Sequence, residues 1–264
     1  MESNTNFVHR KVDEDGWVIQ TMEVLYLLQQ EEEEEELCAS IYNVPREIVQ
    51  TKPQAYSPHS VSIGPYHCWR SELYEMERYK LAAVHRFEKR MNRRGKFQSV
   101  VVEEFRKQDW HIRSCYHNFI NYKGETLAWI MAIDAAFLLE CLQFYVRHDN
   151  ETSDTDVKQL GQVLHPTGSS ASHNAIVRDV MMLKNQLPLF LLQKLLELQL
   201  SFEAKEEERL CTLLRFLCKE LSPFSFKLPE ESKFHTIERG HVLEVLYYSI
   251  VLKHNNNHMP STKR

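Results

Sequence analysis

The chain has 264 residues, of which 43% are hydrophobic and 26% are charged, and these values exclude a disordered or fibrous protein. It contains only 7 glycines and 9 prolines, which disfavours a β-rich fold with many tight turns, and it has no glycine-rich phosphate-binding motif. Its net charge of -5 gives no general attraction for nucleic acid, so we expect no nucleic-acid partner.

The acidic residues are concentrated at the start of the chain. Residues 1–40 hold eleven acidic side chains and two basic ones, and Glu31–Glu36 is an unbroken run of glutamates. A run of like charges repels itself and is normally solvated. We therefore expect residues 1–40 to form an acidic, partly disordered segment, within which Trp17–Gln30 is compatible with a helix.

Cysteine usage and the first residues indicate the compartment. The six cysteines are scattered without a Cys-x-x-Cys pair, and no apolar signal segment opens the sequence. We expect an intracellular protein, cytoplasmic or at a membrane surface, and not a secreted one. The most apolar stretch, Leu127–Val146, contains Asp134 and Glu140, and a carboxylate in mid-membrane costs about 2.5–3.5 kcal/mol. We therefore expect a buried core helix there and no transmembrane span in this chain.

Residues 41–70 are predicted to be ordered and extended. Four prolines in this stretch fix their own φ angles and bias each preceding residue toward extended geometry. Tyrosine and isoleucine side chains can anchor the segment to a core, and Ile63–Tyr66 is expected to be a buried structural turn.

Helical periodicity begins after this segment. In Glu72–Arg94, residues three and four apart form one stripe, and the acidic start and basic end of the segment suit the helix dipole. The members of the stripe are Leu73, Met76, Lys80, Ala83, Phe87 and either Arg90 or Met91. This segment is the clearest predicted helix of the chain, and Ser71 can cap its start.

Further helices are predicted along the rest of the chain. They are 99–118, the central buried helix 125–147, 174–197 with a bend near Asn185–Leu187 caused by Pro188, 203–221 and 241–252. The polar stretch 148–173 is predicted to be a loop, and 253–264 a disordered tail. The fold class is therefore mainly α: an irregular helical bundle over residues 41–252, with one ordered Pro-rich extended segment near the N-terminus.

Few residues suggest chemistry. His67 and Cys68 are compatible with a Cys/His nucleophile, but no base or orienting group follows at a recognisable spacing, and we favour two loop residues after Gly64. Asp134 and Glu140 are six residues apart and lie on different helix faces, so we expect each to pair with a buried base or a backbone group. We predict no catalytic, cofactor-binding or metal-binding residue.

A run of basic residues is the candidate contact for an anionic surface. Between residues 78 and 96 the chain holds eight basic side chains and one acidic one, Glu88. We favour a solvated helix face that complements the helix dipole. The alternatives are peripheral docking to an acidic membrane leaflet or to the chain's own Glu31–Glu36. The residues that would make the contact are Arg86, Lys89, Arg90, Arg93, Arg94 and Lys96.

Several blocks of sequence resemble one known family. They are Ile41-Tyr42-x-Val44-Pro45; Pro53-x-Ala55-Tyr56-x-Pro58-x-x-Val61-Ser62-Ile63-Gly64-Pro65-Tyr66-His67; Leu73-x-x-Met76-Glu77-x-x-Lys80; Asp134-x-Ala136-Phe137-Leu138-Leu139-Glu140; Arg178-Asp179-x-Met181-x-Leu183-x-Asn185-Gln186-Leu187-Pro188-x-Phe190; and His241-Val242-Leu243-Glu244-Val245-Leu246-Tyr247. Together, over about residues 41–252, they resemble the start of the plant "domain of unknown function 247" family, also described as uncharacterised protein family 0481.

The chain departs from the family's usual pattern in three respects. Lys184 stands where the family usually has Glu before Asn-Gln, and Cys68-Trp69 replaces the usual His-Gly. The family's later half, with its C-terminal hydrophobic segment, is absent from this sequence. We therefore expect a short or truncated member, matched over the family's N-terminal part only.

The resemblance implies a plant protein that is largely helical and belongs to a family mostly without known biochemical activity. Many members are predicted to be anchored to a membrane by a C-terminal helix, and some grass members are linked to pollen-side self-incompatibility. It therefore implies a non-enzymatic interaction component of a signalling or recognition pathway, with an unknown protein partner and no cofactor. The alternative is an uncharacterised enzyme with a helical active site around His67, Cys68 and Asp134.

Overall fold

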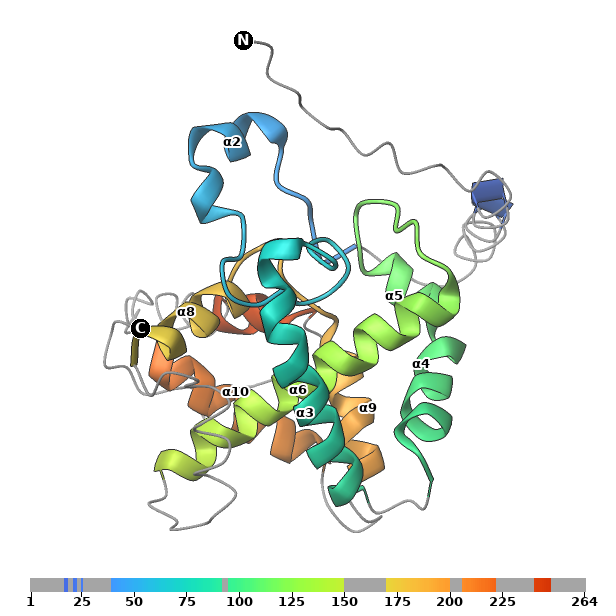
Figure 1. The fold of residues 1–264 in the computed structure, drawn as a ribbon, viewed down its shortest axis with the longest axis vertical. Helices are drawn as coiled ribbons and strands as arrows, with labels where there is room; N and C mark the ends of the chain where they lie inside the picture. Colours follow the sequence, from blue (N-terminus) through green and yellow to red (C-terminus); the bar gives the residue numbers. More distant parts are fainter. Residues whose placement is uncertain are drawn as a thin grey trace, which may run out of the picture.

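The computed structural model describes residues 17–18, 21–22, 25, 39–91, 95–149, 170–199, 206–221 and 240–247 (Figure 1). As the sequence predicts, this part of the chain is mainly helical. The described ranges contain no β-sheet. They hold two isolated β-bridges, one between Ile41 and Tyr116 and one between Pro188 and His241, and each joins segments that are far apart in the sequence.

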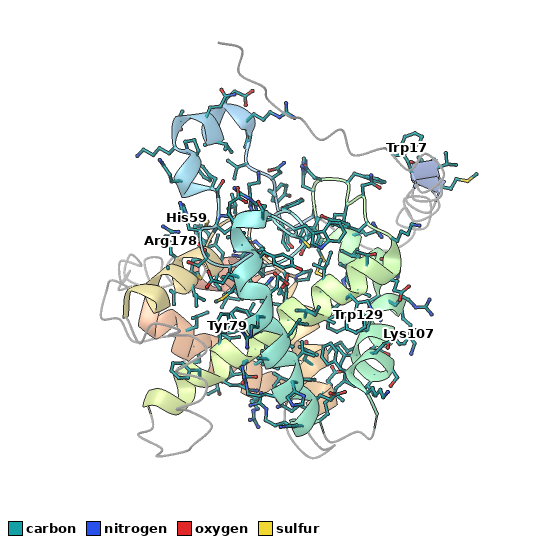
Figure 2. The ribbon with its side chains drawn as sticks, viewed as in Figure 1. Trp17, His59, Tyr79, Lys107, Trp129 and Arg178 are labelled. Atoms are coloured by element: carbon teal, nitrogen blue, oxygen red, sulfur yellow. The ribbon has the colours of Figure 1, made fainter. Side chains whose placement is uncertain are left out.

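Helix α6 (Gly124–Asp149) is the central element of the fold, and side chains gather around it on several sides (Figures 1 and 2). From Leu127 to Phe144 its side chains are buried except for Trp129 and Ile133, which are partly buried. Helices α3, α4, α9 and α10 pack against it. The prediction of a central buried helix at 125–147 is confirmed. The helices around it are α3 (Tyr74–Arg90), α4 (Glu103–Lys107), α5 (Asp109–Ser114), α8 (Ser170–Val180), α9 (Leu189–Gln199) and α10 (Glu206–Leu221).

Over Gly124–Phe144, helix α6 is also long and apolar enough to cross a membrane. Among the described residues, no other helix meets both criteria. However, 89% of its most apolar window is buried inside the protein. A core helix meets the same criteria of length and hydropathy. The burial therefore agrees with the core position that the sequence predicts.

Helix α3 carries the predicted stripe. Its buried side chains are Met76, Lys80, Ala83 and Phe87. The chain enters the helix through a 3₁₀ turn, η2 (Ser71–Leu73), and no side chain caps its first turn, so the predicted cap by Ser71 is wrong. The helix ends at Arg90, and residues 92–94 lie outside the described residues.

The Pro-rich segment is ordered, but the prediction that it is extended throughout is wrong. It contains a six-residue helix, α2 (Arg46–Thr51), and a 3₁₀ turn, η1 (Pro53–Ala55). Pro45 precedes the first helix and Pro53 begins the second. A proline at the start of a helix has a φ angle that is already helical, and its missing N–H group would have no helical partner there. Prolines in this segment therefore begin short helices as well as extended stretches.

The expected turn at Ile63–Tyr66 is present, and all of it is buried except Tyr66, which is half-buried. Gly64 has a φ of 73°, in the left-handed region that favours glycine. A Cβ atom at this position would collide with the carbonyl oxygen of Gln186 and lie 3.0 Å from the Tyr116 hydroxyl. Glycine is therefore required here by both the backbone conformation and the close approach of a second segment.

The helix predicted at 99–118 is interrupted. A π-helical turn, η3 (Gln98–Val102), precedes α4, and α4 ends before Gln108, after which α5 begins. The turn contains three consecutive valines, whose branched side chains are stiff and poorly suited to an α-helix. Apolar residues keep their helical spacing through both interruptions, which is why the sequence predicts a single helix.

The helix predicted at 174–197 is divided into α8 and α9, which are separated by residues 181–188. The side-chain amides of Asn185 and Gln186 donate hydrogen bonds to carbonyl groups at the end of α8. These carbonyls belong to Asp179, Val180 and Met182. The last carbonyls of a helix have no helical partner, so the two amides stabilise the end of α8. The bend expected before Pro188 is therefore a full break.

Several predicted segments lie wholly or mostly outside the described residues. They are residues 1–40, including Glu31–Glu36, the loop 148–173 and the tail 253–264. The disorder predicted for residues 1–40 and 253–264 stays a prediction, and so does the loop over 150–169, whereas the two ends of the predicted loop, 148–149 and 170–173, belong to α6 and α8. Of the last predicted helix, 241–252, residues 242–247 are described and helical.

Candidate functional site

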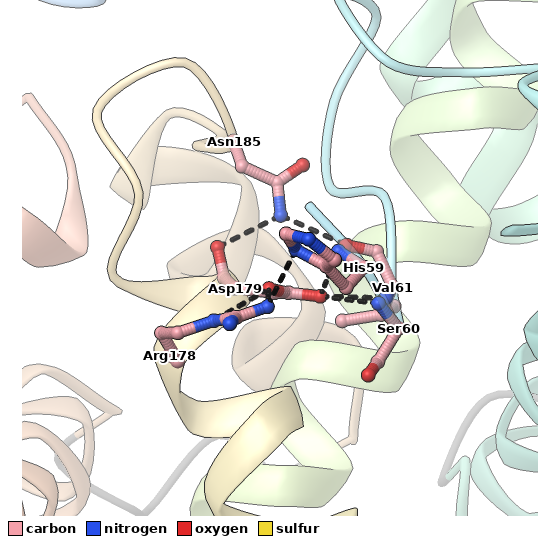
Figure 3. A network of polar contacts seen from close by, with 6 residues as sticks. All are labelled: His59, Ser60, Val61, Arg178, Asp179 and Asn185. Atoms are coloured by element: carbon pink, nitrogen blue, oxygen red, sulfur yellow. Dashed lines mark hydrogen bonds and ion pairs between the residues drawn. The ribbon is translucent and has the colours of Figure 1, made fainter. Parts of the chain in front are cut away.

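The sequence blocks that carry the resemblance meet in a network of buried polar contacts (Figure 3). Asp179, near the end of α8, is fully buried. Its Oδ2 atom accepts hydrogen bonds from three consecutive backbone N–H groups, those of His59, Ser60 and Val61. Its Oδ1 atom accepts one from the exposed Arg178 guanidinium at 3.0 Å. A single carboxylate therefore fixes the segment that leads into the buried turn.

Asn185 and Tyr116 continue the network. The Asn185 Oδ1 atom accepts a hydrogen bond from the Ile63 N–H group at 2.6 Å, and its Nδ2 atom donates to the Val61 carbonyl at 2.9 Å. The Tyr116 hydroxyl donates to the Gln186 carbonyl at 3.0 Å. The break between α8 and α9 is thus held directly against the buried turn.

A buried ion pair joins α3 to α6. The Lys80 ammonium lies 2.7 Å from Asp134 Oδ1 and 2.8 Å from Glu77 Oε1. It also donates to the Ser62 hydroxyl at 3.1 Å, while Asp134 Oδ2 accepts a hydrogen bond from the Gly64 N–H group at 2.8 Å. Burial raises the pKa of Asp134 to about 6, against the attraction of Lys80. Burial lowers the pKa of Lys80, but the two carboxylates outweigh it and leave that pKa raised. The expectation that Asp134 pairs with a buried base is confirmed.

Glu140 forms the second buried ionic contact of α6. Its Oε1 atom lies 2.8 Å from Arg86 Nε and its Oε2 atom 2.6 Å from Arg90 Nη2. The expected pairing of Glu140 is therefore confirmed. Arg86 and Arg90, which the sequence offers as contacts for an anionic surface, are 21% and 26% exposed and are bound to a carboxylate of their own core.

The other four candidates for an anionic-surface contact fall into two groups. Lys89 and Lys96 are exposed, near the end of α3 and ahead of η3. Arg93, Arg94 and the competing Glu31–Glu36 run lie outside the described residues. The contact with a membrane or with the acidic run therefore stays a prediction.

The three residues of the enzyme alternative differ in their surroundings. His67 is buried, and its Nε2 atom has no hydrogen-bond partner in the described structure. Asp134 has both oxygens occupied, so it offers no free base. Cys68 is partly exposed. In the same part of the chain, no group of three or more His, Cys, Asp or Glu residues could hold a metal ion.

Sequence reasoning misses Arg70 and Lys184 as neighbours of His67. The charges of both residues act on the imidazole. Lys184 carries a signal, because it departs from the family's usual Glu. Arg70 carries none, since its position depends on the turn in which its N–H group bonds the His67 carbonyl at 3.4 Å.

Acidification is expected to destabilise the protein through His67. Burial, then the charges of Lys184 and Arg70, lower the pKa of the imidazole from 6.5 to about 4, with Asp179 opposing. The unfolded chain takes up a proton near pH 6.5 that the folded imidazole does not, so stability falls as the pH drops from 6.5 toward 4. The slope from this group is at most about 1.4 kcal/mol per pH unit.

Urea unfolding of His67→Gln at several pH values measures this contribution. The variant should show a shallower loss of unfolding free energy between pH 6.5 and 4 than the wild type. Burial also lowers the pKa of His241, so this residue contributes to the pH dependence of the unfolding free energy in both proteins. Equal slopes would show that the fold does not keep the His67 ring neutral.

One protein-family model and two curated proteins match this chain. The family model DUF247, described as "Plant protein of unknown function", matches residues 41–264. The putative UPF0481 protein At3g02645 of Arabidopsis thaliana is 40% identical over 243 residues, which are 91% of this chain and 43% of that protein. The UPF0481 protein At3g47200 of the same plant is 28% identical over 156 residues, which are 59% of this chain and 30% of that protein. No solved structure matches.

The chain therefore spans less than half the length of either curated relative that it matches. The family match includes all of the sequence blocks quoted above and continues beyond them to residue 264. With a match over most of its length, the chain belongs to the DUF247 family of plant proteins, also named UPF0481.

Proposed function

We propose that this chain is a non-enzymatic protein-interaction component of a plant signalling or recognition pathway. The observation that carries the proposal is how the chain uses its buried polar residues. Asp179, Asn185 and Asp134 are bonded to backbone groups or to a buried base of the same chain. These groups stabilise the fold and are not free to react with a substrate, which favours a scaffold over a reaction centre.

An exposed aromatic surface supports a protein partner. Tyr42, Trp69 and Phe119 are 48%, 60% and 50% exposed. The Tyr42 ring lies 5.4 Å from the His117 ring, and the Trp69 ring lies 5.0 Å from the Tyr122 ring, so both lie against the loop that carries Phe119. Aromatic side chains are enriched at protein interfaces, where they bury a large area with little loss of conformational entropy.

The charges near the aromatic surface favour a protein over a lipid or a nucleic acid. Exposed residues of both signs follow in the same chain segments, namely Arg46 and Glu47 after Tyr42, and Lys123 and Glu125 after Phe119. An anionic membrane or a phosphate backbone would require a surface of predominantly positive sign. A partner protein with an apolar contact and a mixed polar rim fits this pattern better.

The double variant Tyr42→Ser, Phe119→Ser tests the proposal by quantitative affinity capture from plant tissue, followed by direct titration of each purified partner. We expect at least one protein that binds the wild-type chain and whose affinity falls at least about thirtyfold in the variant, since a central aromatic contact contributes about 2 kcal/mol or more. The matched control is Leu81→Ser on α3, which removes a side chain that is 54% exposed.

Two results would contradict the proposal. Equal partner binding by the wild type, the double variant and the control would exclude the aromatic surface as the contact. Turnover of a substrate that depends on His67 or Cys68 would exclude the non-enzymatic assignment.

A further inference from the structure

The imidazole of His67 has a nitrogen that the scaffold does not use. The side chain is 6% exposed, and its Nε2 atom is buried without a hydrogen-bond partner from the described residues. Buried polar atoms are nearly always bonded, to protein, to water or to a ligand. The other polar residues of this region, such as Asp179 and Asn185, already have protein partners. His67 therefore carries a buried nitrogen to which the described residues supply no hydrogen-bond partner.

The charges of two cationic side chains, Lys184 and Arg70, act on His67, and neither side chain has a strong anionic partner among the described residues. Lys184 is partly buried, and burial and then the charge of Arg70 lower its pKa. Within the described part of the chain, Lys184 makes no ion pair, and Arg70 has only the exposed Glu72, at 3.8 Å. The opposing charge is that of Asp179, and its effect on the His67 pKa is smaller than that of either cation. The fold thus keeps two like charges close together beside a buried imidazole.

The backbone explains why these groups meet. Lys184 directly precedes Asn185, which is bonded to the Ile63 N–H group at 2.6 Å. His67 and Arg70 follow Ile63 in the same segment and are joined by a turn. The polar network of Figure 3 therefore holds the Lys184 backbone against the segment that carries the other two groups.

Trp69 stands at the edge of this cluster in a strained conformation. Its φ is 65°, and it is the one non-glycine residue with positive φ in the described structure. For a bulky side chain this conformation is unfavourable, and such strain is concentrated at functional sites. The ring is 60% exposed and packs edge-to-face on Tyr122. An exposed aromatic side chain therefore directly precedes Arg70 in the chain.

We propose that His67, Arg70 and Lys184 form a binding site for the phosphate oxyanion of a phosphate monoester, with Trp69 at its edge. The Arg70 guanidinium and the Lys184 ammonium supply donors and positive charge, which suit an oxyanion and disfavour a metal cation, and the neutral imidazole can add an N–H donor when its proton is on Nε2. The bound phosphate would relieve the repulsion between Arg70 and Lys184 and give the His67 Nε2 atom a partner. Trp69 would favour a ligand with a flat or apolar substituent.

The same oxyanion occurs in soluble phosphate compounds and in the headgroup of phosphatidic acid, so the test has an arm for each. The full chain is titrated by calorimetry with inorganic phosphate and with phenyl phosphate. In parallel it is sedimented with phosphatidylcholine vesicles that contain or lack phosphatidic acid. We expect saturable binding in at least one arm, accompanied by a shift of the imidazole NMR signals of His67 and a rise in its pKa.

The variants Lys184→Gln and Arg70→Gln should each weaken binding by about tenfold or more, because each removes one charge-assisted contact. Lys184→Gln also removes a like-charge repulsion, so thermal unfolding should show it at least as stable as the wild type. The controls are Lys89→Gln, on the basic face of α3, and Lys107→Gln, on α4. In Figure 2, Lys107 lies on the opposite side of the molecule from His59 and Arg178. Neither control should change the affinity.

The outcomes separate the two sources of phosphate. Binding of a soluble probe that depends on Lys184 supports the site and a soluble ligand. Binding confined to phosphatidic acid vesicles, with the same dependence, supports the site and a lipid headgroup. The proposal is overturned if no arm shows saturable binding, or if Lys89→Gln weakens binding as much as Lys184→Gln does. Neither result bears on the aromatic-surface test, which uses different residues.

Discussion

Replacing Lys80 with Met is expected to lower the free energy of unfolding by about 3–5 kcal/mol, which is among the largest effects of single substitutions. The Lys80 side chain is 2% exposed, and its ammonium lies within 2.8 Å of both Asp134 and Glu77. Without it, two carboxylates face each other and Asp134 is left buried with no opposite charge. Urea unfolding followed by circular dichroism measures the loss.

Two further variants make this prediction specific to the buried pair. Lys80→Met combined with Asp134→Asn should be more stable than Lys80→Met alone, because the amide has no charge and can still accept the Gly64 hydrogen bond. Lys194→Met is the matched control, since Lys194 is 35% exposed and pairs with Glu197 at 2.8 Å. It should change stability by less than about 1 kcal/mol. Similar losses for Lys80→Met and Lys194→Met would refute the prediction.

Hydrophobic spacing predicted the central helix α6 and the buried stripe of α3. The long apolar stretch of α6 and the stripe of α3 each need a buried environment, and the structure places the two helices in contact. The position of Lys80 in that stripe predicts where the side chain points. It does not predict the partner, because Asp134 lies on a different helix 54 residues away in the sequence.

Two errors in the predicted fold follow the same pattern, in which one predicted helix is interrupted. Apolar residues keep a helical spacing through 98–114 and 174–197, but the backbone does not follow it. At the second break, Asn185 and Gln186 satisfy the end of α8 with side-chain amides. Such competition between side chain and backbone depends on contacts with the segment at Val61–Ile63, which local sequence does not reveal.

The candidate site was only partly predictable, for a related reason. The sequence indicates that Asp134 and Glu140 need buried partners, and it marks Cys68-Trp69 and Lys184 as departures from the family's usual pattern. In the folded chain the charge of Lys184 acts on His67, although the two residues are more than 100 positions apart in the sequence, and Trp69 has a positive φ two positions after His67. Trp69 adopts the left-handed backbone conformation that glycine adopts without strain. The sequence identifies the unusual residues, but the fold is needed to show that they lie together.

Replacing Asp179 with Ala is expected to destabilise the protein by about 3–5 kcal/mol, because three backbone N–H groups lose their acceptor at once and an unsatisfied buried group costs about 1–3 kcal/mol. The carboxylate is fully buried and joins α8 to a segment about 120 residues earlier in the chain. Asp179→Asn retains an oxygen acceptor without the charge, so it should lose less. Urea unfolding of the three proteins gives this order of stability.

Amide hydrogen exchange distinguishes a local effect from a general loss of stability. In Asp179→Ala, the amides of Ser60 and Val61 should exchange faster than expected from the change in global stability alone, since their hydrogen bonds end on the deleted carboxylate. The control is Arg178→Gln, which removes an exposed partner of the same carboxylate and should change stability by less than about 1 kcal/mol. If both amides kept their wild-type protection in Asp179→Ala, the carboxylate would not be what holds this segment, and the fixed position of Lys184 beside His67 would need another cause.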